Sequence, residues 1–259
     1  MTRLSNATDV RSWLVQLGIE RVTVISPHLD DAVFSVAGIL SACRDRAEVI
    51  TVLTEGSAGH NDAWARTTGF ADSAAEHKAR RQEDALAMSR LGCGFQHLGC
   101  RHDDLNERSV GQAVDAMTQS RTDGLSRTLV LLPAGAGGPS PSTPLSQLAW
   151  RLLRRPWGCM PHGEHELTRD LFWQALSGSR ARLGFYAELP YAWSHSNRAL
   201  QERLHRVLGC HTELVEHRHD ISEKTRLVEL YPSQLIPIFG PNPVYRRRVL
   251  ERTECLLMA

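Results

Sequence analysis

Two short stretches, far apart in the chain, carry residue types that could do chemistry together. The first is His28-Leu29-Asp30-Asp31, which follows an apolar run at 22–26. Charged side chains are rarely buried unless they are paired or bind a metal. A histidine and an aspartate three residues apart can ligate one metal ion, and the neighbouring aspartate then lies within reach of water at that metal. An aspartate cap on the following helix, with His28 uninvolved, is the alternative interpretation.

The second stretch is His162-Gly163-Glu164-His165, which precedes apolar residues at helical spacing. Alone, such a pair is more often a surface feature, because the chain has 12 histidines and chance pairs are frequent. We interpret His217 and His219 as a chance pair of this kind. Together, however, the two stretches supply nitrogen and oxygen ligands and leave one coordination position open. That set is typical of a catalytic zinc ion, although it discriminates weakly against Fe²⁺.

The two stretches resemble the signatures of a known enzyme family. Residues 27–31 are similar to the first signature, P/A-H-P-D-D, of the LmbE-like (PIG-L) zinc de-N-acetylases, and residues 162–165 are similar to the second, H-P-D-H. Their order and separation agree with the family. Leu29 stands where the family usually has proline, and Gly163-Glu164 replaces Pro-Asp. Neither departure removes a ligand.

Two weaker pieces extend the resemblance over most of residues 20–240. Arg80-Arg81-Gln82-Glu83 is similar to the R-x-x-E helix of the family, and Lys224 with residues 231–234 is similar to its K…Y-x-S-Q segment. Each piece is unspecific by itself. In combination with the two signatures they strengthen the prediction of an LmbE-like chain.

The resemblance implies one zinc ion per chain, held by three ligands: His28, Asp31 and His165. It implies Asp30 as the general base that takes a proton from water and passes it to the leaving amine. It also implies His162 as a hydrogen-bond donor to the tetrahedral oxyanion. The sequence alone leaves the reverse assignment of the two histidines in the second stretch open, and Cys159 is a less favoured further ligand.

The reaction implied by the resemblance is removal of an N-acetyl group from an N-acetylglucosamine-type amino sugar on a small glycoside or natural-product intermediate. Four residues are candidates for contacts with that substrate: Glu55, Arg80, His102 and Asp103. Three other functions stay open: a metal-dependent phosphoesterase, an amidase that cleaves a larger acyl or thiol-conjugate amide, and a non-catalytic sugar-binding protein with this fold.

The four substrate candidates also have structural interpretations. His102 stands where a gapless match places a sugar-binding aspartate of the family, and Asp103 follows it directly. Which residue of this loop contacts the sugar therefore stays open. Arg80 could instead form a surface salt bridge with Glu83 or Asp84. Glu55 could simply flank a turn at the following glycine.

Alternating strands and helices predict an α/β, Rossmann-like three-layer fold with a mostly parallel sheet flanked by helices. In such sheets ligands bind beyond the carboxyl ends of the strands. We expect one domain over 1–259, with a Gly/Pro/Ser-rich loop at about 134–144, for which a domain linker is the alternative. The expected strands are 22–26, 48–54, 96–98, 128–133 and 185–191; the expected helices are 10–17, 32–45, 74–91, 109–121, 145–153, 200–208 and 223–230; and 57–73 is an expected loop.

Composition limits the classes of binding partner that the sequence predicts. The formal net charge of +1 offers no electrostatic reason to expect nucleic acid. No run approaches the ~18 apolar residues of a membrane helix, and the N-terminus lacks a signal-peptide core, so we expect no stable membrane anchor. The six cysteines are scattered without a C-x-x-C pair, which indicates reduced thiols and a cytoplasmic protein. The expected partner is a small N-acetylated glycoside, and a homo-oligomer stays open.

Overall fold

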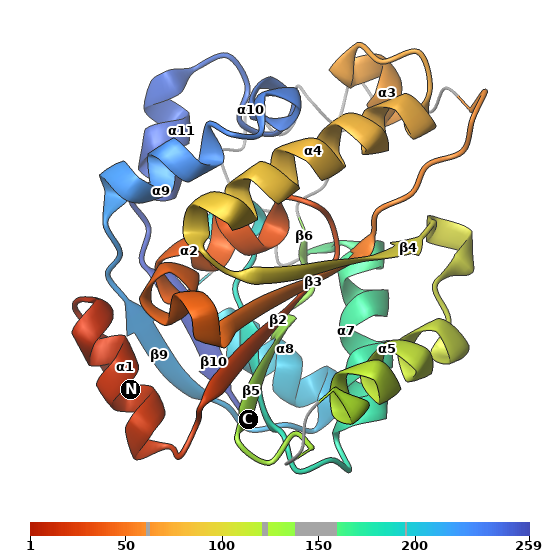
Figure 1. Cartoon of the computed structure of the whole chain (residues 1–259). Coiled ribbons are helices and arrows are strands. Elements are labelled where there is room, and N and C mark those ends of the chain that lie inside the picture. The colour runs from red at the N-terminus through yellow and green to blue at the C-terminus, as the bar shows by residue number, and fades with distance from the viewer. Residues whose placement is uncertain (61–62, 121–123, 138–159, 195) are drawn as a thin grey trace.

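The computed structural model describes residues 1–60, 63–120, 124–137, 160–194 and 196–259. A central sheet of eight strands lies between two layers of helices (Figure 1). The strands are β1 (Thr2–Leu4), β2 (Arg21–Ser26), β3 (Ala47–Leu53), β4 (Gly94–Cys100), β5 (Thr128–Pro133), β8 (Arg182–Tyr186), β9 (Glu213–His217) and β10 (Glu254–Met258). Their order is β1-β9-β10-β8-β5-β2-β3-β4. Strand β10 runs antiparallel to β8 and β9, and the other pairings are parallel. The predicted mostly parallel α/β fold is confirmed.

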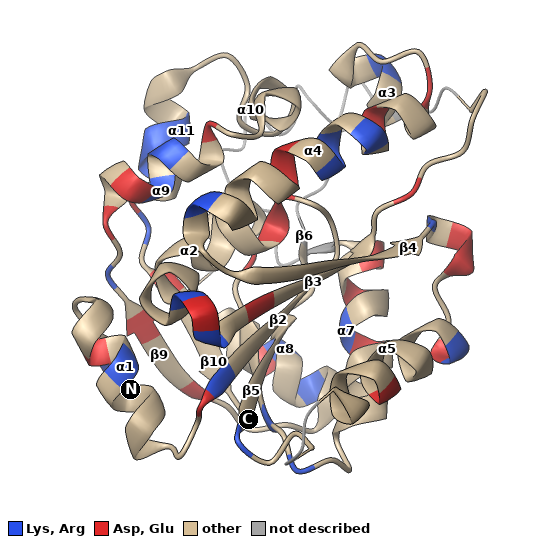
Figure 2. Ribbon diagram, viewed as in Figure 1, with Lys and Arg blue, Asp and Glu red and all other residues tan. Residues whose placement is uncertain are grey.

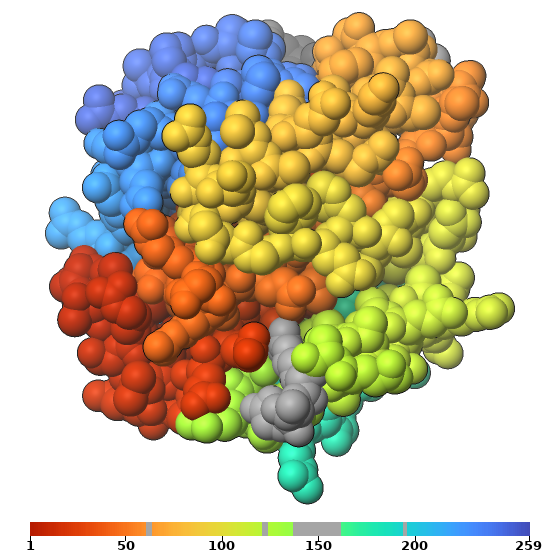
Figure 3. Space-filling view, in the orientation of Figure 1, coloured from red at the N-terminus to blue at the C-terminus, as the bar shows by residue number. Residues whose placement is uncertain are grey.

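Helices cover both faces of the sheet. The longer helices are α1 (Ala7–Gln16), α2 (Asp31–Cys43), α4 (Ser73–Leu91), α5 (Glu107–Gln119), α7 (Gly163–Leu176), α8 (Asn197–Leu208), α9 (Ile221–Val228), α10 (Pro232–Phe239) and α11 (Pro243–Leu250). Side chains from α1, α2, α4, α9, α10 and α11 join one hydrophobic core, and those from α5, α7 and α8 join the other. Figure 3 shows α4 packed beside the C-terminal helices on one face of the molecule.

The central strands are apolar because they are buried on both faces. In β5, Leu129 and Leu131 belong to one core, whereas Val130 and Leu132 belong to the other. A strand covered by helices on both sides has no polar face, so it reads as a continuous apolar run. This is why the predicted strand 128–133 coincides with β5. For the same reason, β2 differs from its prediction by one residue at its start, and β3 differs by one residue at each end.

The strand order reverses between β2 and β5. Strands β3 and β4 follow on one side of β2, and β5 and β8 lie on the other. In doubly wound sheets a ligand crevice forms at such a reversal, outside the carboxyl ends of the strands. Residues 27–31 leave β2 at this point, and residues 134–137 leave β5 beside them.

Several elements differ from the predictions. The expected loop 57–73 contains a short helix, α3 (Ala63–Thr68), which contacts α4 and α10. The expected strand 185–191 ends at Tyr186, and Tyr191 begins a 3-10 helix, η3 (Tyr191–Ser194). The expected helix 145–153, Cys159 and most of the expected loop 134–144 lie outside the described residues; inside them, Ala136–Gly137 (β6) pairs with Met160–Pro161 (β7).

Other expectations concern chemistry rather than elements. The described cysteines, Cys43, Cys93, Cys100, Cys210 and Cys255, are free. None of the helices in the described ranges has the length and apolar character needed to cross a membrane. The interpretation of His217 and His219 as a surface pair is wrong, because both side chains are buried where β9 and the turn after it meet β10 and α2.

Candidate metal centre and active site

The first stretch forms a tight turn between β2 and α2. The Ser26 hydroxyl donates to the carbonyl of His28 (2.6 Å) and accepts from the backbone N–H of Ala32 (3.1 Å), which fixes the path of the turn. The N–H of His28 donates to Oδ2 of Asp31 (3.0 Å). Asp30 occupies the N-cap position of α2, yet its side chain makes no capping hydrogen bond. The interpretation of Asp30 as a helix cap is therefore wrong.

Three side chains converge above this turn. Nδ1 of His28 lies 3.1 Å from Oδ2 of Asp31 and 3.2 Å from Nε2 of His165, which lies 3.3 Å from the same carboxylate oxygen. His165 comes from the first turn of α7 and is fully buried. Within the described ranges, this is the group of three residues whose ligand atoms approach closely enough to share one metal ion. Both imidazole nitrogens point at the same small volume as the carboxylate.

Contacts on the outer side of each ring leave the inner nitrogens suited to bind a metal. Nδ1 of His165 lies 3.3 Å from Oε1 of Glu188, and Nε2 of His28 lies 2.8 Å from Oε2 of Glu164. An ionised carboxylate only accepts, so each ring presents an N–H outward and a lone pair inward when it is neutral. Metal-binding histidines commonly have such partners. The donor set therefore fits a zinc ion.

The electrostatics of the three ligands also favour a cation. Burial lowers the pKa of His28, but hydrogen bonds to Asp31 and Glu164 raise it to about 9. Burial likewise lowers the pKa of His165, whereas the charge of Asp31 and hydrogen bonds to Asp31 and Glu188 raise it to about 10. These carboxylates stabilise positive charge at the two rings, which is what a divalent ion supplies.

Asp30 lies beside the ligands and is held by an arginine. Its Oδ1 is 3.1 Å from Nη2 of Arg80, while Nη1 of Arg80 is 3.1 Å from Oε1 of Glu76. Burial raises the pKa of Asp30 to about 6, although the charge of Arg80 lowers it. Arg80 is only 5% exposed. The predicted alternative of a surface salt bridge to Glu83 or Asp84 is therefore wrong in both its location and its partners.

His162 is the N-cap residue of α7, and its ring lies among the other site histidines. Its centroid is 4.2 Å from that of His165 and 5.6 Å from that of His28. Burial and the charges of these two rings lower the pKa of His162 to about 4, so the ring is neutral near neutral pH. Its Nδ1 is buried and has no hydrogen-bond partner among the described residues.

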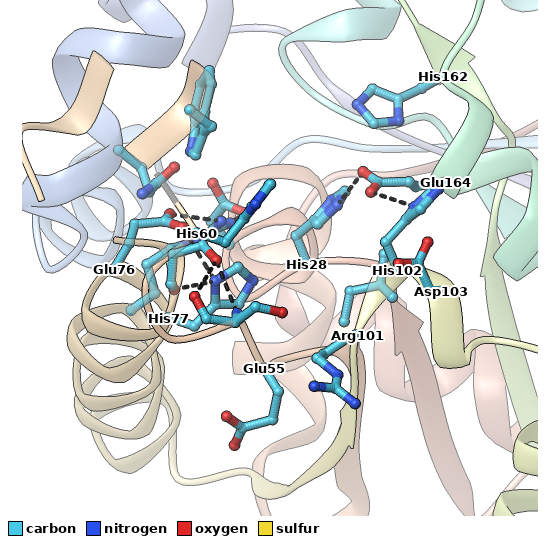
Figure 4. A pocket seen from close by; sticks show the side chains of 18 of the residues that line it. His28, Glu55, His60, Glu76, His77, Arg101, His102, Asp103, His162 and Glu164 are labelled. Atoms are coloured by element: carbon cyan, nitrogen blue, oxygen red, sulfur yellow. Dashed lines mark hydrogen bonds and ion pairs between the residues drawn. The ribbon is translucent and has the colours of Figure 1, made fainter. Parts of the chain in front are cut away.

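A cavity of about 490 Å³ opens at this point (Figure 4). The predicted site residues that line it are His28, Asp30, Glu55, Arg80, His102, Asp103 and His162. Nδ1 of His102 lies 2.9 Å from Oε1 of Glu164, so the loop after β4 and the start of α7 meet across the mouth. Glu55 forms an ion pair with Arg81 (2.8 Å) at the rim, and its contact with substrate stays a prediction.

Sequence reasoning missed several residues of the site. Glu164 was treated only as a departure from the family signature, and it contacts two histidines. Glu188 interrupts the apolar run 185–189, and it is fully buried. The argument used for Asp30 and Asp31, that an isolated carboxylate in an apolar run needs a partner, would have found Glu188. The spacing of Glu76 and Arg80, four residues apart in an expected helix, is typical of an ion pair, but no sequence signal places Asp30 against Arg80.

Comparisons with known proteins agree with this geometry. Residues 23–141 match the family model described as PIG-L, GlcNAc-PI de-N-acetylase. No curated protein matches the sequence.

Among solved structures, a deacetylase triple mutant of the teicoplanin biosynthetic pathway has a TM-score of 0.64 and 22% identity, with 92% of this chain and 97% of that chain covered. The zinc-inhibited form of teicoplanin deacetylase Orf2 has a TM-score of 0.63 and 22% identity, with the same coverage. The A40926 pseudoaglycone deacetylase Dbv21 has a TM-score of 0.61 and 21% identity, with coverage of 92% and 96%. Likeness at this level of identity shows a shared fold over nearly the whole chain.

Proposed function

We propose that the chain is a member of the PIG-L (LmbE-like) family of de-N-acetylases, whose model matches residues 23–141, and that it removes an N-acetyl group from an N-acetylglucosamine-type amino sugar on a small glycoside or natural-product intermediate. One observation carries the proposal: a His-Asp-His ligand set and a buried aspartate lie at one end of a cavity large enough for a small ligand. The similar folds of deacetylases that act in teicoplanin and A40926 chemistry support a glycoside substrate.

We assign the metal site to His28, Asp31 and His165, with one zinc ion per chain. A bound zinc ion would polarise the amide carbonyl and lower the pKa of water at the site towards ~7. The zinc-inhibited form of teicoplanin deacetylase Orf2 supports binding of zinc by this fold, although zinc is an inhibitor of that protein. Fe²⁺ is an alternative occupant, because imidazole and carboxylate ligands discriminate weakly between such ions.

Asp30 is the proposed general base and general acid. Its carboxylate takes a proton as water attacks the amide carbon, and it then delivers that proton to the leaving amine nitrogen. Burial raises the pKa of Asp30, while Arg80 and a bound cation would lower it, so the group is ionised near neutral pH and burial makes it a better proton acceptor than an exposed aspartate. Arg80 holds the carboxylate by its Oδ1, which fixes the direction from which Asp30 acts.

His162 is the proposed donor to the oxyanion. The ring is neutral near pH 7 because its pKa is lowered to about 4, so it carries one N–H that can stabilise negative charge on the former carbonyl oxygen. It comes from the same turn of α7 as His165. The two rings therefore face one cavity while performing different tasks.

Contacts to the sugar are proposed for the rim of the cavity. His102 and Asp103 lie on η2 (His102–Asp104), the short 3-10 helix after β4, and Glu55 lies after β3. Arg80 lines the inner wall, and its Nε has no hydrogen-bond partner among the described residues. These groups supply donors and acceptors of the kind that bind hydroxyls. A two-metal phosphoesterase would need a second ligand group, and the described residues hold one.

The test combines metal content with amine release from a panel of N-acetylated glycosides. We expect about one zinc ion per chain and release of acetate with a free amine. Asp30→Asn should keep the metal and lose turnover by about 10²–10⁴-fold. Asp115→Asn, the same change at an exposed position on α5, is the matched control and should leave turnover unchanged.

Three results would contradict parts of the proposal. Near-wild-type kcat in Asp30→Asn would remove Asp30 from the mechanism. Two metal ions per chain with hydrolysis of phosphate esters would replace the deacetylase with a phosphoesterase. Cleavage of long-chain or thiol-conjugate amides in preference to acetyl would keep the chemistry and change the acyl group.

A further inference from the structure

The positive charges that line the cavity are already paired with carboxylates of the chain itself. Arg80 has both terminal nitrogens engaged, one with Asp30 and one with Glu76, at 3.1 Å each. Arg101 lies 2.8 Å from Asp104 through its Nε. In the described ranges these two are the only lysine or arginine side chains in the cavity wall. Each arginine is therefore already paired with at least one carboxylate of the chain, which weakens its attraction for an anionic substrate group.

Carboxylates, in contrast, are in excess around the cavity. Among the described residues, five of them line it: Asp30, Glu55, Glu76, Asp103 and Glu164. A divalent ion at the ligand set must be counted too; its two charges are balanced by Asp31 and Asp30. After the ion pairs of Glu76 with Arg80 and of Glu55 with Arg81 are removed, Asp103 and Glu164 remain as a surplus of negative charge.

This surplus lies at the mouth of the cavity. Glu164 contacts His28 and His102, which carry no compensating charge when they are neutral. Asp103 forms no ion pair with any residue in the described parts of the chain and lies next to His102 on the same short 3-10 helix. Figure 4 shows His102, Asp103 and Glu164 together on one side of the cavity, and Figure 2 shows acidic ribbon at the turn after β4.

The inner wall of the cavity also holds a hydrogen-bond acceptor that has no donor among the described residues. Gln234 is fully buried and lines the cavity, and its Nε2 donates to Oγ of Ser233 (2.9 Å). The Ser233 hydroxyl gives its own hydrogen to Glu83 (2.6 Å), so it must accept from Gln234. This fixes the amide orientation and leaves Oε1 of Gln234 without a partner. A buried carbonyl oxygen requires a donor, which an ammonium or a hydroxyl supplies and a carboxylate or phosphate does not.

From these observations we propose the charge class of the substrate, an inference that rests on the proposed function. The group attached to the N-acetylated sugar is uncharged or carries an amine, and the cavity discriminates against carriers that bear a phosphate or a carboxylate. The interaction acts at the mouth, where the carrier of a sugar seated at the metal site must pass.

The test uses three glycosides of N-acetylglucosamine that differ in one terminal group: 2-aminoethyl, 2-hydroxyethyl and carboxymethyl. Binding is measured by calorimetry on zinc-loaded His162→Ala, a slow variant that keeps the charge of the cavity, at pH 8 and low salt. At this pH unperturbed histidines are neutral. We expect the aminoethyl probe to bind most tightly and the carboxymethyl probe most weakly, with at least about ten-fold between them, because the two probes differ by two unit charges. The spread should shrink at 1 M salt.

Substitution of the surplus carboxylate locates the effect. In the same background, Asp103→Asn should reduce the ratio between the aminoethyl and carboxymethyl probes by several-fold. Asp115→Asn, which removes one exposed carboxylate on α5 outside the cavity wall, should leave the ratio unchanged. An equal response to both substitutions would assign the preference to net charge and overturn the proposed role of the mouth.

The outcomes separate this inference from the function. Equal or tighter binding of the carboxymethyl probe, or no binding of any probe, would overturn the charge class. Failure of the zinc-loaded wild-type enzyme to release amine from any of the three glycosides would reject the proposed deacetylation, whereas the binding order would still decide the charge class.

Discussion

Two buried clusters of histidine and carboxylate lie along α2, one at its first residue and one beside Gly38 and Ile39, and they differ in where their positive charge comes from. The first is the ligand set of His28, Asp31 and His165. The second, formed by Glu254 with His217 and His219, contains a lysine: Nζ of Lys224 lies 3.0 Å from Oε1 of Glu254, and Nδ1 of His217 lies 3.2 Å from Oε2. In the described residues, the ligand set has no lysine or arginine contact of this kind.

The second cluster completes a broken helix. Helix α2 is kinked at Val36, and Glu254 accepts hydrogen bonds from the N–H groups of Gly38 (2.8 Å) and Ile39 (3.0 Å) that follow the kink. A Cβ on Gly38 would lie 2.5 Å from Cβ of His219, so only glycine fits there. A carboxylate from β10 therefore acts as the cap of the second half of α2.

The source of the cation decides the role of each cluster. The second cluster needs no external cation, because Lys224 already balances the charge of Glu254 within the chain. In the first cluster, two ring nitrogens and a carboxylate oxygen meet without a cation from the chain. This arrangement suits the binding of an external metal ion. Histidine content and burial, which the two clusters share, do not distinguish them.

The largest expected effect separates the clusters by metal content. His28→Ala, Asp31→Ala and His165→Ala should each lose the zinc ion and all measurable deacetylation. His217→Ala, a histidine removed from the other cluster, should keep about one zinc ion per chain. Atomic emission spectroscopy on folded, monodisperse protein measures this directly. Full metal content in all three ligand variants would show that the ligand assignment is wrong.

A second prediction concerns the internal cation. Lys224→Met leaves the Glu254 carboxylate buried without its partner, which should cost about 3–5 kcal/mol of unfolding free energy. Lys78→Met, at the exposed lysine of α4, is the matched control and should cost little. The zinc content of both folded variants should equal that of the wild type. A metal loss in Lys224→Met would mean that the two clusters are coupled through α2.

The same cluster predicts how stability depends on pH. Burial alone would raise the pKa of Glu254, but Lys224 and His217 hold it well below its usual range. A carboxylate with a depressed folded-state pKa stabilises the protein above its unfolded pKa, ~4.3, and loses this contribution as the pH falls below that value. The deficit of Lys224→Met should therefore be largest near neutral pH and shrink in acid. Urea unfolding between pH 7 and pH 3 measures it, and a deficit that grows in acid would contradict this account.

The sequence predicted the strands that are buried on both faces and failed where tertiary pairing creates the element. Strand β10 contains Glu254 and β9 ends at His217, so neither reads as an uninterrupted apolar run, although the strands are paired side by side. The polar residues that obscured the pattern are those that form the second cluster. Helix α3 is short, and it lies in a polar segment whose packing against α10 no local pattern reveals.

For the site, residue types and spacing identified the groups close to the metal but not their partners. His28, Asp30 and Asp31 are adjacent in sequence, and the resemblance to a family supplied His165. The partners of these groups come from other elements: Glu188, after β8, contacts His165, and Arg80, on α4, contacts Asp30. Spacing along one chain segment carries no information about such contacts, because they depend on how the sheet and the helices pack.

A third, smaller effect tests the division of labour within the first cluster. His162→Ala should keep the zinc ion and lower kcat by about 10²–10³-fold, the usual cost of losing one oxyanion donor. KM should change little, because the contact forms mainly in the transition state. Metal loss in His162→Ala with retention in His165→Ala would exchange the two roles. Retention of both metal and activity in both variants would reject the zinc hydrolase.

The smallest expected effect compares Glu188, which contacts His165 of the first cluster, with Glu254 of the second cluster. Glu188 accepts from the backbone N–H groups of Gly135 (2.6 Å) and Ala136 (3.1 Å), much as Glu254 accepts from α2, and its Oε1 also lies 3.3 Å from His165. Glu188→Gln keeps an acceptor for the backbone and weakens the hold on the ligand ring. Metal affinity should fall by about 10–100-fold.

Glu254→Gln is the matched variant for this last comparison, because it makes the same change at a carboxylate that contacts no metal ligand. It should lower the free energy of unfolding, since Lys224 loses its counter-charge, and leave zinc affinity unchanged. Competition with a fluorescent zinc chelator measures the affinity, and urea unfolding measures the stability. If both glutamine variants weakened zinc binding equally, Glu188 would have no specific role in orienting His165, and the distinction between a cluster built for a metal and a cluster closed by a lysine would fail at this residue.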